Sequence, residues 1–293
     1  MPARTTPPPI AGRYDLLDQV GAGAMGSVWR ARDLRAAPGQ PSLVAVKVLG
    51  AHDSSMLLRF VREQSVRIAH PHVVAPTGWA AEDHRVVFTM DLVRGGSLET
   101  LRAEHGPLPA SYVAVLLDQL LQALEAVHAA GVVHRDVKPA NLLLEPGGPH
   151  LRLGDFGVAV VLDDVRLTRG PGVVGTDRYM PPEQAAGAPP DPRQDLYAAG
   201  VVATELLGGR TGPLRPLLGA LTDPDPELRP PTATEALVRL RRVDVPLDGP
   251  WPEVPDRLGD PPATRGHRWA NAVIAASLLV IAACVVANVL MLL

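Results

Sequence analysis

Two lysines, Lys47 and Lys138, stand out because the other 26 of the 28 Lys and Arg residues are arginine. Where any positive side chain would serve, this chain therefore uses arginine. A lysine ammonium is a compact point charge on a flexible stem, which suits it to hold phosphate oxygens. Lys47 ends the strand-like run VAVK (44–47), and a solvated charge at a strand edge is the alternative interpretation. The bias toward arginine favours phosphate binding.

A glycine-rich run, VGAGAMGSV (20–28), precedes Lys47. Glycines let backbone N–H groups approach phosphate oxygens without a Cβ in the way. A dinucleotide-binding loop of this kind should open a helix and have an acidic residue about 20 positions later. Residues 28–32 (VWRAR) instead alternate like a strand. The run therefore predicts a hairpin that covers a nucleotide.

The densest cluster of reactive side chains lies in HRDVKPAN (134–141) and DFG (155–157). Lys138 follows Asp136 by two positions, and Asn141, one of three asparagines, follows it by five. Together with the glycine-rich run and Lys47, these residues resemble the signature set of protein kinases. The chain resembles the bacterial Ser/Thr (Hanks-type) kinases, which are similar to eukaryotic kinases. The resemblance covers roughly residues 14–243.

This resemblance implies an ATP-dependent transfer of the γ-phosphoryl group to protein hydroxyls. Lys47 would hold the α- and β-phosphates and pair with Glu63, the match in RFVRE (59–63). Asp136 would orient the substrate hydroxyl for in-line attack. Lys138 would neutralise charge on the γ-phosphoryl group. Such a reaction depends on positioning and charge neutralisation more than on covalent catalysis.

The same resemblance implies MgATP as the cofactor. Asn141 and Asp155 would supply oxygen ligands to Mg²⁺, a hard cation that keeps water and phosphate in its shell. The nucleotide itself would be bound by the glycine-rich run, the strand of Lys47, a gatekeeper and a hinge. These residues are Val20, Gly21, Ala22, Gly23, Ala24, Met25, Gly26, Ser27, Val28, Ala45, Lys47, Met90, Asp91, Val93 and Leu143. For each apolar member, ordinary core packing is the alternative.

Regulation is expected at Arg135, Thr168 and Thr176. An Arg beside the catalytic Asp is, in this family, the partner of a phosphorylated activation loop. Thr168 is the best match for the phosphorylated position, which predicts autophosphorylation there, whereas Thr176 would contact the substrate. Further on, Asp195 would brace the catalytic loop and Arg229 would pair with Glu183.

Two other classes of function compete with the active protein kinase. A catalytically impaired signalling scaffold is one, because only nineteen residues (207–225) lie where the family has a substrate-docking helix. A kinase-fold enzyme acting on a small molecule is the other. The presence of Asp136, Asn141 and Asp155 favours catalysis. The activation-segment match over residues 168–183 favours a protein substrate.

The resemblance implies an α+β, two-lobed protein-kinase-like fold, and the elements expected from the sequence agree with it. Val-rich runs at 28–32, 43–49 and 85–92 predict strands. Residues 111–130 have apolar residues at helical spacing between an N-cap-type Ser111 and Gly131, which predicts a helix. Strands followed by helices predict a sheet-rich lobe joined to a helical lobe, with a ligand site in the cleft between them.

Composition limits the partners. A formal net charge of −3 gives no long-range reason to expect nucleic acid. One cysteine, Cys284, excludes a disulfide framework and a Cys-based zinc site. The resemblance implies ATP and protein substrates as partners, and the apolar end of the chain predicts a membrane as another.

The chain divides by composition into four zones. Residues 1–11 form a disordered leader, and 12–243 form the kinase domain, with lobes at about 12–93 and 94–243. Residues 244–268 are a Pro-rich juxtamembrane linker, expected to be semi-extended.

The last zone, residues 269–293, is expected to be a transmembrane helix. It has no charged residue, and as a helix it would be about 37 Å long, enough to cross a hydrocarbon core of about 30 Å. A buried soluble helix is the alternative. Arg265 and Arg268 before it place the kinase in the cytoplasm at the cell membrane. Small residues four apart within it make a homodimer a further expectation, although an Ala-rich composition alone also produces that spacing.

Overall fold

The computed structural model describes residues 8–23, 26–39, 41–49, 68–82, 85–155 and 177–261. Residues 1–259 form one compact unit and residues 260–293 a second. The expected membrane segment at 269–293 lies outside the described residues. Five expected site residues also lie outside them: Ala24, Met25, Glu63, Thr168 and Thr176.

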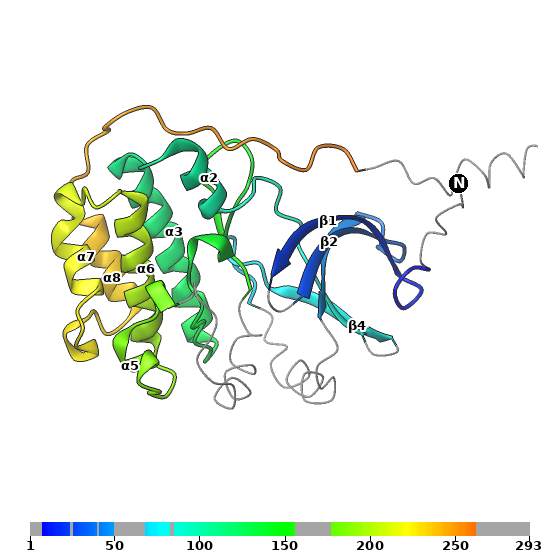
Figure 1. The fold of residues 1–293 in the computed structure, drawn as a ribbon, viewed down its shortest axis with the longest axis horizontal. Helices are drawn as coiled ribbons and strands as arrows, with labels where there is room; N and C mark the ends of the chain where they lie inside the picture. Colours follow the sequence, from blue (N-terminus) through cyan, green and yellow to red (C-terminus); the bar gives the residue numbers. More distant parts are fainter. Residues whose placement is uncertain are drawn as a thin grey trace, which may run out of the picture. The chain divides into compact units, whose positions relative to one another are not determined.

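The first lobe is a five-stranded antiparallel sheet in the order β1-β2-β3-β5-β4 (Figure 1). Its strands are β1 (Tyr14–Gly23), β2 (Gly26–Asp33), β3 (Leu43–Leu49), β4 (Pro76–Glu82) and β5 (Arg85–Met90). The predicted strand at 43–49 coincides with β3, and those at 28–32 and 85–92 fall on β2 and β5. Alternate residues of β3 and β5 face opposite sides of the sheet, so Val46 and Val87 join one core cluster while Leu49 and Phe88 join another.

The second lobe is mainly helical. Its α-helices are α2 (Leu98–His105), α3 (Ala110–Ala129), α5 (Pro182–Ala185), α6 (Pro192–Leu206), α7 (Arg215–Leu221) and α8 (Ala233–Arg241). The described part of this lobe also contains a two-stranded ribbon and four 3-10 turns: β6 (Leu142–Leu144), β7 (Leu151–Leu153), η1 (Pro139–Asn141), η2 (Asp177–Tyr179), η3 (Gly212–Leu214) and η4 (Pro226–Leu228). The chain thus has a β-rich and an α-rich lobe, in agreement with the two-lobed fold that the resemblance implies.

Helix α3 is the central helix of the second lobe. Its leucines, Val113 and Val127 are buried in the main core, against α6, α8 and β7. It is the one helix within the described ranges that is long and apolar enough to span a membrane, and 56% of that stretch is buried inside the protein. Burial of this kind is what the core helix of a globular lobe requires.

The start of α3 differs from the prediction. The N-cap position is Pro109, which has no capping side chain, and Ser111 lies inside the first turn. The hydroxyl of Ser111 donates to Asp248 instead of capping its own helix. The free N–H groups of α3 therefore find their acceptor in a segment far along the chain.

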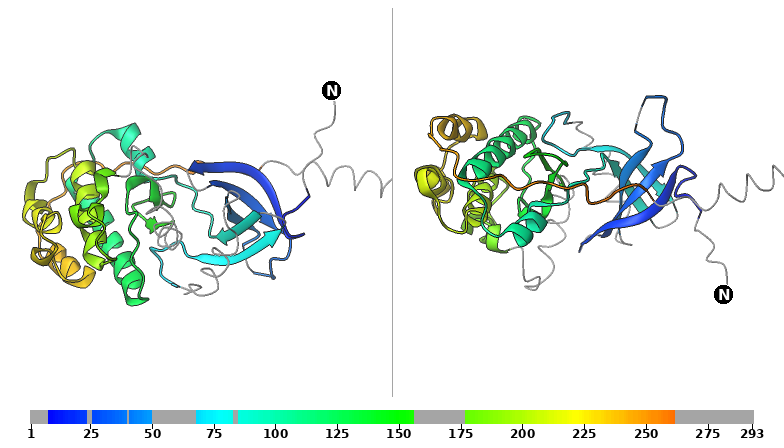
Figure 2. Two further views of the ribbon diagram at one scale, coloured as in Figure 1. Left: turned by 60° about the horizontal axis from the view of Figure 1, so that its bottom comes forward. Right: turned by 90° about the horizontal axis from the view of Figure 1, so that it is seen from above.

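That segment belongs to the expected Pro-rich linker. Residues 244–261 contain no helix or strand, in keeping with their composition. Up to residue 259, however, they lie against the lobes and run from the helices toward the sheet (Figure 1, orange; Figure 2, right). The linker is thus extended, but its first part is packed on the folded domain.

Candidate active site

The glycine-rich run forms the hairpin between β1 and β2. Ala22 pairs with Ser27, and Gly23 with Gly26, at its tip. Gly26 has φ +138°, and a Cβ there would lie 2.1 Å from the carbonyl oxygen of Val48 on β3. Position 26 therefore accepts only glycine, because the hairpin is pressed onto the neighbouring strand.

Lys47 lies on the central strand of this sheet. It is opposite Val28 of β2 and Phe88 of β5, and it is 5% exposed. Its Nζ is 2.9 Å from Oδ1 of Asp155, which comes from the other lobe. A solvated charge at a strand edge is thereby excluded for Lys47. The expected pairing with Glu63 lies outside the described residues.

Lys138, a predicted catalytic residue, and Asn141, a predicted metal ligand, meet at the carboxylate of Asp136. Nζ of Lys138 lies 2.9 and 2.8 Å from its two oxygens. Nδ2 of Asn141 donates to Oδ2 of Asp136 at 2.9 Å and to its backbone carbonyl at 2.8 Å. Two donors thus fix the orientation of a carboxylate that is 15% exposed. It can accept a hydrogen bond from a hydroxyl placed beside it.

The loop that holds Asp136 is organised by a buried residue of α6. Asp195, 1% exposed, accepts the backbone N–H groups of His134 at 2.8 Å and Arg135 at 2.7 Å. The same carboxylate is 2.8 Å from Nε2 of His128. Arg135 has φ 61°, a conformation that costs about 1 kcal/mol or more in a non-glycine residue. The brace expected at Asp195 is confirmed.

Asp155 is positioned through the residue before it. The N–H of Gly154 donates to the carbonyl of Asn141 at 2.9 Å, and its carbonyl lies 3.0 Å from Nε2 of His134. Asp155 itself has φ 59°. These bonds fix both ends of Gly154, so the strained backbone of Asp155 is imposed by the catalytic loop.

Asn141 and Asp155 fit a magnesium site by the chemistry of their free oxygens. Because Nδ2 of Asn141 is bound to Asp136, its Oδ1 is the atom left to coordinate a cation. Asp155 binds Lys47 through Oδ1 and is 40% exposed, which leaves Oδ2 accessible. No group of three or more His, Cys, Asp or Glu able to hold a metal occurs among the described residues. Two protein oxygens are enough for Mg²⁺ when phosphates complete the shell.

The predicted adenine-binding residues flank the same cleft. Ala45 of β3 is buried and lies opposite Met90 of β5. Oδ2 of Asp91 accepts from Arg152 at 2.7 Å. The remaining apolar members are half-buried: Val20, Val28, Val93 and Leu143. Partial burial leaves each of them surface to offer a ring.

A bidentate ion pair closes the base of the helical lobe. The guanidinium of Arg229 donates to Glu183 at 2.6 and 2.8 Å and lies 4.8 Å from the ring of Tyr197. Burial by itself would raise the pKa of Glu183, but the hydrogen bonds from Arg229, a backbone hydrogen bond and the positive charge of Arg229 together outweigh it and hold the pKa below its usual range. The predicted pairing of Arg229 with Glu183 is confirmed.

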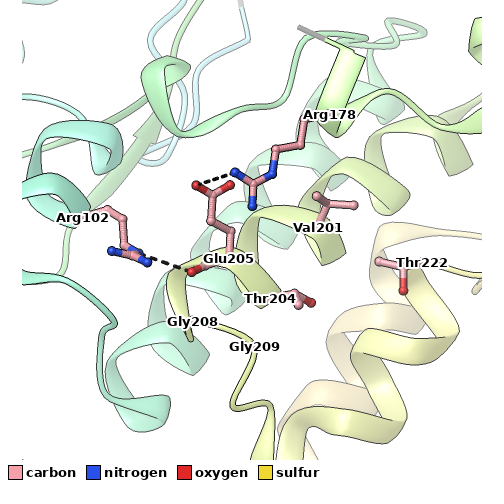
Figure 3. Close-up of a pocket in the computed structure, with 8 residues that line it drawn as sticks. All are labelled: Arg102, Arg178, Val201, Thr204, Glu205, Gly208, Gly209 and Thr222. Atoms are coloured by element: carbon pink, nitrogen blue, oxygen red, sulfur yellow. Dashed lines mark hydrogen bonds and ion pairs between the residues drawn. The ribbon is translucent and has the colours of Figure 1, made fainter. Parts of the chain in front are cut away.

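A hollow of about 500 Å³ beside this lobe was not predicted (Figure 3). Glu205 stands at its wall, accepts from the hydroxyl of Tyr179 at 2.7 Å and lies 3.4 Å from a guanidinium nitrogen of Arg178. Arg102 donates to the Glu205 carbonyl at 3.3 Å. Burial and the neighbouring carboxylate raise the pKa of Tyr179. A glutamate near a helix end has no feature in the sequence that would set it apart.

Known proteins with similar sequences are protein kinases. Residues 14–215 match the family described as protein kinase domain. The chain is 42% identical over 216 residues to the serine/threonine-protein kinase PkaA of Streptomyces coelicolor, which covers 69% of this chain and 40% of that protein. It is 34% identical over 254 residues to PknA of Mycobacterium tuberculosis, covering 81% and 58%. With PknB of Mycobacterium leprae it is 38% identical over 215 residues, covering 70% and 34%. The chain thus matches between about a third and somewhat over half of these relatives' lengths.

Proposed function

The chain belongs to the protein kinase family, and from this premise we propose that it transfers the γ-phosphoryl group of ATP to serine and threonine hydroxyls of proteins. Membership implies ATP as the donor. The observation that carries the proposal is the convergence of Lys138 and Asn141 on the carboxylate of Asp136. The serine/threonine kinases of Streptomyces and Mycobacterium that this chain resembles support the choice of acceptor.

The catalytic step would proceed from the geometry of the loop. Asp136, fixed by two donors, would accept the hydrogen bond of the substrate hydroxyl and aim its oxygen at the phosphorus. Lys138, already beside that carboxylate, would balance negative charge on the transferred group. Lys47, buried between the lobes, would hold the α- and β-phosphates. Its present partner, Asp155, lies at the same point of the cleft.

We propose that Asn141 and Asp155 hold Mg²⁺ through their free oxygens. The chemistry such an ion would supply is partial neutralisation of the phosphate charge. The chain's own contribution is to keep the two oxygens in place. It does so by tying Nδ2 of Asn141 to Asp136 and the backbone of Gly154 to His134 and Asn141.

The test is transfer of labelled γ-phosphate by the full chain in detergent to itself and to a basic protein acceptor. Asp136→Asn should lower the rate by roughly a hundredfold or more, because the hydroxyl loses its orienting acceptor. Asp244→Asn, the same change at an exposed position outside the cleft, should retain the wild-type rate. Equal labelling by wild type and Asp136→Asn would overturn the proposal and leave a kinase-like scaffold.

Activation by autophosphorylation at Thr168 is proposed on the position of Arg135. That residue adjoins Asp136, and its backbone is held by Asp195, so a phosphate bound to its guanidinium would act directly on the catalytic loop. Thr168→Ala should then lower activity after preincubation with ATP, and Thr168→Glu should restore part of it. Unchanged activity in Thr168→Ala would contradict the assignment.

We propose that residues 269–293 anchor the kinase in the cell membrane as a single helix, with the kinase domain on the cytoplasmic side. The support is twenty-five residues without a charge, preceded by Arg265 and Arg268. Fractionation should find the full chain in membranes and a chain ending at residue 268 in the soluble fraction. A truncated chain that still sediments with membranes would overturn the anchor. Cross-linking of the full chain in membranes tests the homodimer.

A further inference from the structure

Residues 244–259, here called the strap, connect the two lobes along the side of the hinge. The strap has no helix or strand, yet it contacts elements from α3 of the helical lobe to β2 of the sheet (Figure 1). A composition of Pro, Gly and charged residues predicts a free linker. The contacts below show which parts of the domain hold it.

The strap is first anchored at the start of α3. Asp248 accepts the N–H groups of Ala110 at 2.6 Å and Ser111 at 3.1 Å, together with the Ser111 hydroxyl at 2.7 Å. Trp251 donates from Nε1 to the same hydroxyl at 3.0 Å, and its ring meets Tyr112 edge-on at 5.6 Å. Asp248 thus supplies the cap that Pro109 does not provide.

Val254 fixes the strap in the main core. Its side chain is 1% exposed, and its carbonyl accepts from the N–H of Gly147 at 2.9 Å. A Cβ on Gly95 would lie 2.4 Å from the carbonyl oxygen of Leu144 on β6 and 2.5 Å from Cγ1 of Val254. The strap and β6 together occupy the space that a side chain at Gly95 would need.

Arg257 then binds the hinge itself. Its N–H donates to the carbonyl of Arg94 at 2.9 Å, and its Nε donates to the carbonyl of Gly95 at 3.0 Å. The same guanidinium pairs with Glu104 of α2 at 2.8 and 2.5 Å, which lowers the pKa of Glu104. A Cβ on Gly96 would lie 2.7 Å from Cδ of Arg257. One residue thus binds two successive hinge carbonyls and a helix of the second lobe.

The last two residues of the strap are bound by the first lobe. Arg30 of β2, 3% exposed, donates to the carbonyls of Leu258 and Gly259 at 3.0 Å each. Asp18 fixes that guanidinium from the other side at 2.7 and 2.9 Å. Arg94 adds a bond to the carbonyl of Gly259 at 2.7 Å. A change in the angle between the lobes would break these hydrogen bonds or the hydrogen bonds of Arg257.

We propose that the strap is a positioning element for ATP: Arg257 holds the hinge in the conformation whose backbone receives the adenine. The proposal rests on the proposed function and extends it to a segment outside the catalytic motifs. Residues 91–93, expected to meet the nucleotide, directly precede the carbonyls that Arg257 binds. Arg257 is a positioning residue because it contacts the hinge from the strap and acts on ATP only through it.

The experiment measures MgATP affinity by calorimetry and steady-state kinetics on the full chain in detergent. Arg257→Ala should raise the Kd and the KM for ATP about five- to tenfold, with kcat and the KM for the protein acceptor within twofold. Arg257→Lys keeps the charge and the backbone N–H but lacks the bidentate fork, and it should recover part of the affinity. Glu104→Gln leaves both hinge bonds of Arg257 in place and should change the ATP affinity less than Arg257→Ala.

Trp251→Ala is the control for stability alone. It loosens the strap at α3 and should lower the melting temperature while leaving the Kd for ATP unchanged. If Arg257→Ala lowers the melting temperature to the same degree and also leaves the Kd unchanged, the strap only stabilises the fold and the proposal is overturned. Binding of ATP by the wild type without phosphoryl transfer would defeat the proposed function and leave the strap's role standing. A wild type that binds no ATP would defeat both.

Discussion

The catalytic loop and the strap are both irregular segments, and both are held by side chains that bind backbone groups of successive residues. In the loop, one carboxylate of Asp195 accepts two neighbouring N–H groups. In the strap, one guanidinium residue, Arg257, binds two neighbouring carbonyls of the hinge. The side chains differ in their surroundings. Asp195 is 1% exposed, whereas the side chains of Arg257 and its partner Glu104 are 24% and 44% exposed.

That difference decides what each segment does when a contact is lost. Water cannot reach the N–H groups that Asp195 serves, so their desolvation is uncompensated once the carboxylate changes. Water does reach the strap, so each of its contacts contributes modestly and is weakened by salt. We therefore expect the loss of one contact in the loop to disrupt the whole loop, and the loss of one contact in the strap to have only a small effect. A graded contact is suited to adjust nucleotide affinity without unfolding the protein.

The largest effect is expected from Asp195→Asn. The asparagine has nearly the same shape, but its NH₂ group would face N–H donors of the loop. We expect the free energy of unfolding to fall by about 3 kcal/mol. Phosphoryl transfer should fall by a hundredfold or more, because a displacement of about 1 Å at the reacting groups has that effect. Urea unfolding and labelled phosphate transfer measure the two quantities.

Asp191→Ala is the matched control in the same helix. Asp191 caps α6 through the N–H of Arg193 at 2.7 Å, and among the described residues its side chain makes no hydrogen bond to the catalytic loop. Its loss should cost about 1 kcal/mol and leave the rate intact below the melting transition. An Asp195→Asn protein with full activity would break the contrast drawn between the loop and the strap.

The residues of the catalytic loop could be predicted from the sequence because their chemistry requires a local pattern. The run at 134–141 and Asp155 require certain residue types at fixed spacing, and the structure brings them together at Asp136 and Lys47. Both ends of strand β3 were predicted correctly, because its alternating valines fit the periodicity of a strand and no other. By contrast, the sequence did not indicate β4, and it indicated β1 only where that strand enters the glycine-rich hairpin. β4 begins with Pro76, contains Gly78 and is mostly exposed.

The strap could not be placed from the sequence, because its partners are ordinary residues far away. Pro-rich composition predicts its lack of helix and strand. It does not predict that the carbonyl of Leu258 meets Arg30, 228 positions earlier. The prediction that Ser111 caps α3 was wrong for the same reason. Ser111 has the residue type of an N-cap, but Asp248, 137 positions away, accepts the N–H groups instead. Long-range bonds between common charged residues leave no local pattern.

An intermediate effect with a pH signature is expected at the buried pair of the helical lobe. Glu183→Gln removes the negative charge that pairs with Arg229, whose side chain is 0% exposed. The loss should be about 2 kcal/mol near pH 7. Because the pKa of Glu183 is held below its usual value of 4.5, this stabilisation is present above that value and is lost as the pH falls through the folded pKa. Urea unfolding should show the wild type and Glu183→Gln converging below about pH 4.5.

The control for that pair is Glu235→Gln on α8. Glu235 pairs with Arg239 one turn away, and both side chains are more than 40% exposed. The substitution should change the free energy of unfolding by less than about 0.5 kcal/mol at any pH in the range. A gap between wild type and Glu183→Gln that stays constant down to pH 3.5 would show that the charge on Glu183 does not stabilise the fold.

The smallest effect is expected at the strap's first anchor, in Asp248→Ala. Partial burial would raise the pKa of Asp248, but hydrogen bonds from Ser111 and Ala110 outweigh it and lower the pKa. Because the carboxylate is exposed to water, its loss should cost only about 1 kcal/mol, the usual contribution of an N-cap. Asp248→Asn retains an acceptor oxygen and should recover most of it. If Asp248→Ala lowers the free energy of unfolding as much as Asp195→Asn does, exposure to water does not explain a difference between the two segments. The strap is then as important for stability as the loop.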